Sequence, residues 1–267
     1  SDGSSDGGGG SASGGVWEPT AAELSSWGCV FDPDAGPADE LLINHASYEI
    51  PRSKLRCMRR GCWLNDEVIN LYMVLLQERD TSMRTHLPPG VAKPPRCHFF
   101  NSFFLSKLYK DSRKYDYNAV RRWTTPVRLK ASSQVSANLM DVDRIIMPVN
   151  DNNIHWTCAV IDIAGKRLMY LDSMQGRDEE LLENLARYIS DECSNKCGRP
   201  LDTSDWPRVH MGSLPRQQNG CDCGVFSILY ADRLGLGKGF DFTQSDVTEN
   251  ARVKVLHRLL TCKVPLC

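Results

Sequence analysis

Residues 144–172 read RIIMPVNDNNIHWTCAVIDIAGKRLMYLD and contain three short apolar runs separated by polar or glycine-containing breaks. The runs Arg144–Val149, Trp156–Ile163 and Arg167–Asp172 have the length and the apolar content of buried strands. Ala164–Lys166 predicts a tight hairpin between the last two runs. We therefore expect a central group of strands built largely from this stretch.

Segments with helical spacing of apolar residues lie on both sides of this strand group in the sequence. The segment Trp63–Glu67 leads into apolar positions that recur at intervals of three and four, which indicates an amphipathic helix. Asn65 or Asp66 is expected to cap its start, and the helix is expected to end near Arg79. Further helices are predicted at Leu181–Ile189, Cys223–Leu234 and Ser245–Leu260. The chain is thus predicted to be an α+β domain with a central sheet and flanking helices.

The remaining segments carry weaker signals. Residues 16–60 are expected to form an irregular entry region with short elements, including an extended piece at Glu49–Arg52. The prolines of residues 80–96 predict a loop. Cys97–Tyr109 contains four phenylalanines and is expected to pack against the core as a strand or short helix. Arg208–Met211 is predicted to be a further short strand.

The first fifteen residues, SDGSSDGGGGSASGG, contain no side chain that can fill a core. Ordering them would cost conformational entropy without burial, so we expect residues 1–15 to be a disordered tail. Residues 16–267 are long enough for one large domain or two small ones, and we expect a single domain there. The stretch also lacks the apolar core of a signal peptide.

Composition narrows the class of protein. Apolar residues make up 41% and charged residues 24% of the 267 residues, which is typical of a globular protein. No apolar run approaches the roughly 18 residues of a membrane span, so no membrane insertion is expected. The formal net charge of −1 gives no indication of a nucleic-acid partner. We interpret local arginine clusters as solvated surface, with docking of an acidic partner as the alternative.

The chain contains eleven cysteines. Without a signal peptide we expect free thiols in a reducing compartment. Structural zinc is the alternative, but the three close cysteine pairs have spacings of five, four and two residues, and none is a C-x-x-C knuckle with a matching second half. The pairs are Cys57/Cys62, Cys193/Cys197 and Cys221/Cys223. No metal and no cofactor are expected.

One of these cysteines is a candidate nucleophile. Cys223 follows the Asn219–Gly220 turn and opens an apolar helical stretch. A thiol at a helix N-terminus faces unpaired N–H groups and the positive end of the helix dipole, which favour the thiolate. Gly224 is expected to leave the backbone open to a closely approaching substrate. The alternative is that Cys223 is a small buried residue at the start of a helix.

A thiolate mechanism needs a base and a group that orients the base. His155 is the candidate base, because it lies where a polar turn enters a strand. Asp172 is the candidate orienting group, because the hairpin brings it near the same end of the paired strands. Gln217 is the candidate donor to the oxyanion, together with the Cys223 N–H. Taken singly, these are a loop histidine, a strand end and a loop glutamine.

Taken together, these residues resemble the Ulp/SENP family of SUMO-specific cysteine proteases. The resemblance spans residues 40–260 and extends to separate motifs in the same order. The motifs are Trp63-Leu64-Asn65-Asp66, Phe100–Phe104, Arg122-Trp123-Thr124, His155-Trp156, Asp172-Ser173-Met174 and Gln217-x-Asn219-Gly220-x-Asp222-Cys223-Gly224.

The resemblance implies a papain-like fold in which Cys223 is the nucleophile, His155 the base and Asp172 the orienting group. It also implies that Gln217 donates to the oxyanion. Trp63 and Trp156 correspond to the two tryptophans that form a narrow channel over the Gly-Gly end of the substrate, where residues with a Cβ are excluded. Without the family, both would equally be core aromatics.

The loop before the nucleophile departs from the family pattern at two positions. A second glutamine, Gln218, follows Gln217, and counting back from Cys223 favours Gln217 as the donor. Cys221 is an additional thiol, which we expect to be inert rather than to form a resting disulfide. Asn219 and Gly220 are expected to contribute to substrate binding.

The expected function is a SUMO protease that matures the SUMO precursor and removes SUMO from lysines. Its expected partners are SUMO and SUMO-conjugated proteins, and the enzyme is expected to be a monomer. By family analogy it is expected in the nucleus or at the nuclear envelope, and also in the cytoplasm. The alternatives are a protease for another modifier such as NEDD8, a catalytically inactive SUMO-binding module, and an acetyltransferase; the two tryptophans and the Gln-x-Asn-Gly loop argue against the last.

Overall fold

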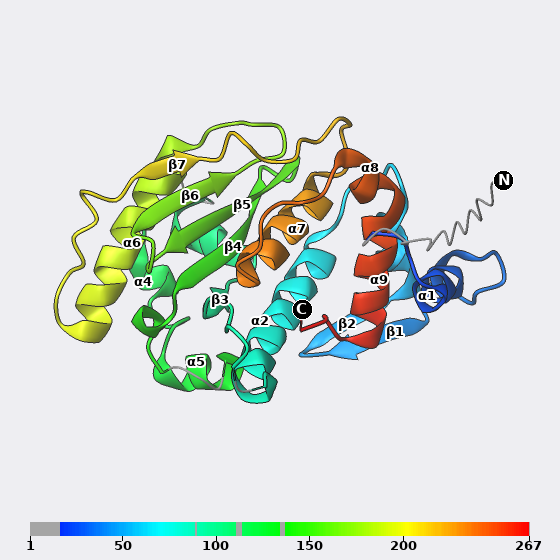
Figure 1. The fold of residues 1–267 in the computed structure, drawn as a ribbon, viewed down its shortest axis with the longest axis horizontal. Coiled ribbons are helices and arrows are strands. Elements are labelled where there is room, and N and C mark those ends of the chain that lie inside the picture. The colour runs from blue at the N-terminus through cyan, green and yellow to red at the C-terminus, as the bar shows by residue number, and fades with distance from the viewer. Residues whose placement is uncertain (1–16, 89, 111–113, 134–136, 267) are drawn as a thin grey trace, which may run out of the picture.

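The computed structural model describes residues 17–88, 90–110, 114–133 and 137–266. At its centre is a five-stranded sheet in the order β3-β4-β5-β6-β7 (Figure 1). The strands are β3 (Cys97–Phe99), β4 (Arg144–Asp151), β5 (His155–Asp162), β6 (Arg167–Leu171) and β7 (Arg208–His210). This confirms the predicted strand group. The tail expected at residues 1–15 lies outside the described residues.

The middle of the sheet is antiparallel and its two edge strands pair in parallel. β5 pairs with β6 down to Asp162 opposite Arg167, so the predicted hairpin is confirmed. β4 pairs with β5 up to Asp151 opposite His155. The turn between them places Asn152 and Asn153 at φ of 52° and 59°, the left-handed region that asparagine tolerates. This polar turn delivers His155 at the first position of β5.

Helices cover both faces of the sheet (Figure 1). Alternating residues of β5 separate two cores: Val160 belongs to the core that includes α2 and α7, and Ile161 to the core that includes α6. The first core is formed with α2 (Asp66–His86), α7 (Cys223–Gly235) and α9 (Arg252–Thr261). The second is formed with α3 (Phe103–Leu105), α4 (Tyr117–Val120), α5 (Pro126–Ser133) and α6 (Glu179–Cys197). The predicted α+β class is confirmed.

Two helices are longer than predicted. α2 continues to His86 rather than ending near Arg79, because Met83 still faces the core and the first proline stands only at Pro88. The loop predicted from residue 80 therefore begins after α2. α6 continues to Cys197 and ends at Gly198, whose φ of 74° is the usual left-handed helix end.

The entry region contains more regular structure than predicted. α1 (Ala21–Phe31) is preceded by the N-cap residue Thr20, which forms a capping box with Glu23. The strands β1 (Leu41–His45) and β2 (Tyr48–Pro51) form a separate hairpin, which confirms the extended piece near Glu49. The 3-10 helix Arg52–Met58 follows. Because the first core closes over Val30, Ile43 and Ile50, tertiary packing holds these short elements in place.

The last helical segment is divided rather than continuous. It comprises α8 (Gln244–Asp246), a π-helical turn (Val247–Ala251) and α9. The Cys97–Tyr109 region is both a strand and a helix, since β3 is followed by α3 and a second π-helical turn, Ser106–Lys110. Within the described ranges, no helix is both long and apolar enough to cross a membrane.

Candidate active site

The candidate nucleophile opens α7. Cys223 is the first residue of this helix, is only 2% exposed and packs into the first core. Asp222 occupies the N-cap position, but its side chain makes no cap hydrogen bond to α7. The thiol is therefore both a buried side chain and a group at the positive end of a helix dipole.

His155 and Asp172 are brought together by the β5–β6 register. The last pair of that register is Cys158 with Leu171, so Asp172 continues β6 opposite Thr157, two residues from His155 on the same face. His155 Nε2 lies 2.7 Å from Asp172 Oδ1. The hydrogen bond confirms the predicted proximity of the two side chains and leaves Nδ1 for another partner.

The carboxylate of Asp172 is held in place by the loop that follows it. Its Oδ1 accepts from the Met174 N–H at 2.8 Å, and its Oδ2 accepts from the Gly176 N–H at 2.8 Å. A Cβ on Gly176 would lie 2.5 Å from Oδ2, so this close approach requires glycine. Asp172 is thereby fixed in the orientation that receives the imidazole N–H.

The charges of this pair are stabilised mutually. The hydrogen bond to Asp172, together with the nearby Cys223, raises the pKa of His155 to about 10. Burial alone would raise the pKa of Asp172, but the hydrogen bonds from His155 and from the Met174 N–H hold it below its usual value. At neutral pH the ring is thus an imidazolium paired with a carboxylate, which can supply a proton to a leaving group.

Gln217 is anchored beside this triad by the residue after Asp172. Its backbone N–H donates to the Ser173 carbonyl at 3.0 Å, and Ser173 Oγ donates to Gln217 Oε1 at 3.0 Å. The side-chain Nε2 of Gln217 donates to the Asn219 carbonyl. Gln218 is exposed and uses its backbone N–H to bind Gln244. The contacts of Gln217 hold its amide in the loop before Cys223, and its role toward an oxyanion stays a prediction.

Asn219 and Gly220 shape the turn into α7. Asn219 Oδ1 accepts from the backbone N–H groups of Cys221 and Asp222, both at 3.1 Å. The Gly220 carbonyl accepts from Trp63 Nε1 at 2.6 Å. Both residues thus have internal contacts, and their expected part in substrate binding stays a prediction. Burial and the nearby Asp222 carboxylate raise the pKa of Cys221, which keeps this thiol protonated.

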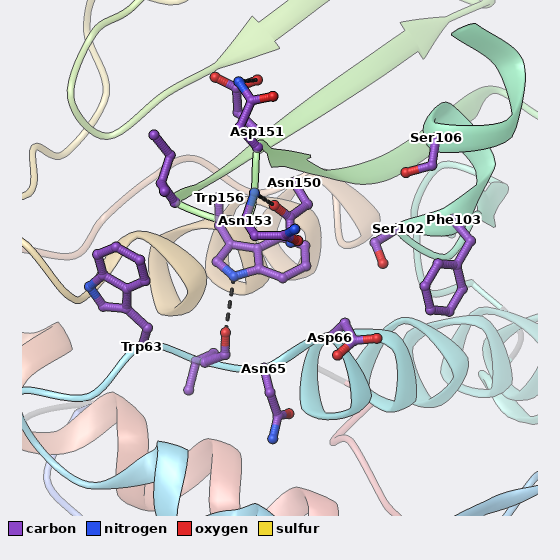
Figure 2. A pocket seen from close by; sticks show the side chains of 13 residues that line it. Trp63, Asn65, Asp66, Ser102, Phe103, Ser106, Asn150, Asp151, Asn153 and Trp156 are labelled. Atoms are coloured by element: carbon purple, nitrogen blue, oxygen red, sulfur yellow. Dashed lines mark hydrogen bonds between the residues drawn. The ribbon is translucent and has the colours of Figure 1, made fainter. Parts of the chain in front are cut away.

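A cleft of about 600 Å³ opens beside the tryptophans, with Trp63 and Trp156 among the residues that line it (Figure 2). Trp156 is 5% exposed and donates from Nε1 to the Leu64 carbonyl at 3.0 Å, whereas Trp63 is 49% exposed. One indole is therefore fixed in the core and the other stands at the surface. The other walls are Leu64–Asp66, Ser102, Phe103, Ser106 and the β4–β5 turn Asn150–Ile154.

Gly224 has a role that differs from the expected one. It is buried, and a Cβ at this position would lie 2.9 Å from the Cβ of Leu64. Since Leu64 stands between Trp63 and Asn65 at the start of α2, the glycine allows α7 to pack closely against the base of the tryptophan cleft. The group that approaches Gly224 closely is thus Leu64 of the same chain.

The sequence interpretation missed Arg252, whose guanidinium binds the Asp222 carboxylate with Nη2 at 2.6 Å from Oδ1. Its position carried a signal: Arg252 recurs with Val255, Leu256 and Leu259 on the apolar face of the predicted helix. Ser173 was likewise missed as an anchor of Gln217. Across the part of the chain that the structure describes, no group of three or more His, Cys, Asp or Glu side chains is arranged to hold a metal ion.

Comparison with known sequences shows which protein family the chain matches. Residues 62–262 match the model of the "Ulp1 protease family, C-terminal catalytic domain". The chain is 43% identical over 213 residues to ubiquitin-like-specific protease 1A of Arabidopsis thaliana, covering 78% of this chain and 39% of that protein. It is 36% identical over 211 residues to human sentrin-specific protease 2, covering 78% of this chain and 32% of that protein. The chain thus spans about two fifths or less of these relatives.

The fold agrees with a solved structure. The catalytic domain of the Ulp1-like SUMO protease of Chaetomium thermophilum superposes with a TM-score of 0.72 at 25% identity, covering 93% of this chain and 92% of that one. The predicted fold class is therefore confirmed over nearly the whole chain.

Proposed function

Because the chain belongs to the Ulp1 protease family, we propose that it is a cysteine protease that cleaves after the C-terminal Gly-Gly of SUMO. It would mature the SUMO precursor and release SUMO from substrate lysines. The observation that carries the proposal is the 2.7 Å contact between His155 and Asp172, with Cys223 raising the pKa of the same ring from the start of α7. The names of its relatives, a ubiquitin-like-specific and a sentrin-specific protease, support the substrate.

The proposed reaction has two stages. The Cys223 thiolate attacks the carbonyl carbon of the terminal glycine, and the electron pair of the carbonyl moves to the oxygen. The resulting oxyanion accepts hydrogen bonds from the Cys223 N–H and the Gln217 amide. The His155 imidazolium then gives its proton to the departing amine as the C–N bond breaks, which leaves a thioester. Neutral His155 next takes a proton from water, which attacks the thioester and releases the carboxylate and the thiol.

The cleft explains how a Gly-Gly end would be selected. Trp63 bonds to the Gly220 carbonyl, two residues before Asp222, and therefore connects the cleft wall to the loop of the nucleophile. Two indoles leave room for backbone without a Cβ, so a diglycine would reach the thiol where larger residues would clash. We infer that the adjoining cleft receives the residues that precede the diglycine.

Cleavage of a SUMO–fluorophore conjugate by the wild type and by Cys223→Ala tests the proposal. We expect activity in the wild type and none above background in the variant, because the covalent step is lost. Undiminished cleavage by Cys223→Ala would contradict the mechanism. NEDD8 and ubiquitin conjugates run in parallel test the substrate, because faster cleavage of NEDD8 would reassign the protease to that modifier.

Labelling of Cys223 by a SUMO vinyl-sulfone separates an enzyme from an inactive binding module. A module that binds SUMO without labelling would contradict catalysis. Location in the nucleus, at the nuclear envelope or in the cytoplasm, and a monomeric state, stay predictions, which imaging of the full-length protein and light scattering would test.

A further inference from the structure

Arg252 is among the most deeply buried charged residues of the described chain, at 1% exposure on the first turn of α9. Its Nε and Nη2 both donate to Asp222 Oδ1, at 3.1 and 2.6 Å. A buried guanidinium is stable only where its donors are satisfied, and a forked contact to one carboxylate oxygen holds both groups in one geometry. The carboxylate belongs to the residue directly before Cys223.

The other end of Asp222 is equally engaged. Its Oδ2 accepts from Asn219 Nδ2 at 2.8 Å, from Gln244 Nε2 at 2.9 Å and from Thr248 Oγ1 at 3.0 Å. An aspartate at an N-cap commonly accepts from an N–H of the first helical turn, whereas this one makes no such bond. The network therefore turns the carboxylate away from the start of α7, where the proposed oxyanion would form.

The same guanidinium joins the nucleophile loop to the tryptophan cleft. Arg252 Nη2 donates to the Cys62 carbonyl at 2.8 Å and to the Cys221 carbonyl at 3.2 Å. Cys62 directly precedes Trp63, and Cys221 lies two residues before Cys223. One nitrogen atom thus links the segment before Trp63 to the loop that presents the thiol, in addition to the contact of Trp63 with Gly220.

Arg252 also compensates a charge. Burial is the largest cause that raises the pKa of the neighbouring Cys221 thiol. The Asp222 carboxylate raises this pKa further, and Arg252 lowers it. The two charges therefore act in opposite directions on a thiol in this loop. An uncompensated carboxylate beside Cys223 would disfavour an anion there and would repel the oxyanion.

We propose that Arg252 is a positioning residue for the reaction: it turns the Asp222 carboxylate away from the α7 N-terminus and holds the Cys223 loop at a set distance from Trp63. The inference rests on the proposed protease function. Arg252 acts through Asp222 and two backbone carbonyls, so it does not itself touch the substrate.

Arg252→Lys is the informative variant, because lysine keeps the positive charge but lacks the fork that binds Asp222, Cys62 and Cys221 together. Arg79→Lys is the matched control. Arg79 is buried, pairs with Asp232 on the same helix α7, and contacts neither the Cys223 loop nor the Trp63 segment in any described hydrogen bond. Both variants lose a forked arginine contact to α7, one at each end of the helix.

Two rates are compared at a temperature at which thermal unfolding shows both variants to be folded. One is kcat/KM on the SUMO–fluorophore conjugate, and the other is alkylation of Cys223 by iodoacetamide, followed by mass spectrometry of its peptide. For Arg252→Lys we expect both rates to fall, kcat/KM by about 100-fold, the order of loss for a reacting group misplaced by an ångström. We expect Arg79→Lys to keep both rates.

Equal losses in the two variants, or wild-type rates in Arg252→Lys, would overturn the inference. So would a loss of turnover with normal alkylation, since the thiol would then be correctly placed. If Arg252→Lys does not fold, Arg252→Gln, which also lacks the fork and leaves the Asp222 carboxylate in place, replaces it and is expected to show the same two losses; wild-type rates in Arg252→Gln would overturn the inference. Alkylation needs no modifier substrate, so it decides about Arg252 even where the wild type cleaves no SUMO conjugate.

Discussion

The His155 ring is charged over the whole range in which a free histidine titrates, because Asp172 and Cys223 both face it. The Asp172 hydrogen bond is the largest contribution, and Asp172 is itself oriented by two backbone N–H groups of the following loop. The charge state of the proposed base is therefore set by a residue on the neighbouring strand.

At this scale we predict that Asp172→Asn lowers the pKa of His155 from about 10, because the variant removes both the charge and the strongest acceptor at Nε2. Nitrogen NMR of the ring at pH 7.5 should show both nitrogens protonated in the wild type and a neutral ring in the variant. The kcat should fall by about 1,000- to 10,000-fold, as expected when the orienting carboxylate of a triad is lost.

Asp162→Asn is the control for this prediction, because Asp162 is a buried carboxylate of the same β5–β6 hairpin that contacts Arg167 rather than the histidine. It should leave the His155 signals unchanged. A ring that stays doubly protonated in Asp172→Asn would show that another group sustains its charge.

Among the elements, the contact between the start of α7 and the segment before α2 determines where the cleft lies relative to the thiol. Gly224 permits this contact, with Leu64 on the other side. The residues before α2 supply Trp63 at the surface, and Leu64 supplies the carbonyl that binds the buried Trp156. A small change in the spacing of the two helices would therefore move the cleft away from Cys223.

We predict that Gly224→Ala lowers stability by about 1–3 kcal/mol through overpacking and also lowers kcat/KM by roughly 10-fold or more, because α7 must move from Leu64 and the thiol moves with it. Urea denaturation and turnover of the SUMO–fluorophore conjugate measure the two effects.

Gly235→Ala is the matched variant. Gly235 lies at the other end of α7, and a Cβ there would lie 2.9 Å from the ring of Phe99. It should be destabilised similarly and keep its activity. Equal loss of activity in both variants would mean that overpacking anywhere on α7 is sufficient.

The whole molecule is organised as two cores on opposite faces of one sheet. β5 contributes Val160 to one core and Ile161 to the other, and both are fully buried. Since the same strands form a wall of each core, neither core can lose its packing without loosening the strands on which the other core packs. His155, Asp172 and Cys223 lie where the first core meets the ends of β5 and β6.

We predict that Leu185→Ala in α6 and Leu256→Ala in α9 each lower the free energy of unfolding by about 2–5 kcal/mol, the usual cost of a cavity in a core. Each variant should unfold in a single transition, with coincident curves from far-ultraviolet circular dichroism and tryptophan fluorescence. Separate transitions by the two probes would contradict the shared-sheet argument and indicate two independent folding units.

Much of this molecule follows from local patterns. The continuous apolar runs between Arg144 and Leu171 determine three central strands that are buried on both faces, and helical spacing determines α2, α6 and α7, because burial of one face of a helix requires that period. The positions of His155 and Asp172 relative to one another also follow, since a hairpin register brings them to one end of two strands. The motifs around Trp63 and Cys223 identified the family from sequence alone.

Only the tertiary structure decided what joins those parts. Arg252 and Cys62 are 190 residues apart in the chain, yet they meet at 2.8 Å, and no local period encodes such a contact. The same holds for Leu64 against Gly224 and for the packing that keeps α1 and the far end of α2 helical. Local pattern specifies which face of an element is apolar, whereas the partner of that face depends on how distant segments pack together, and this packing sets the spacing between the thiol and the cleft.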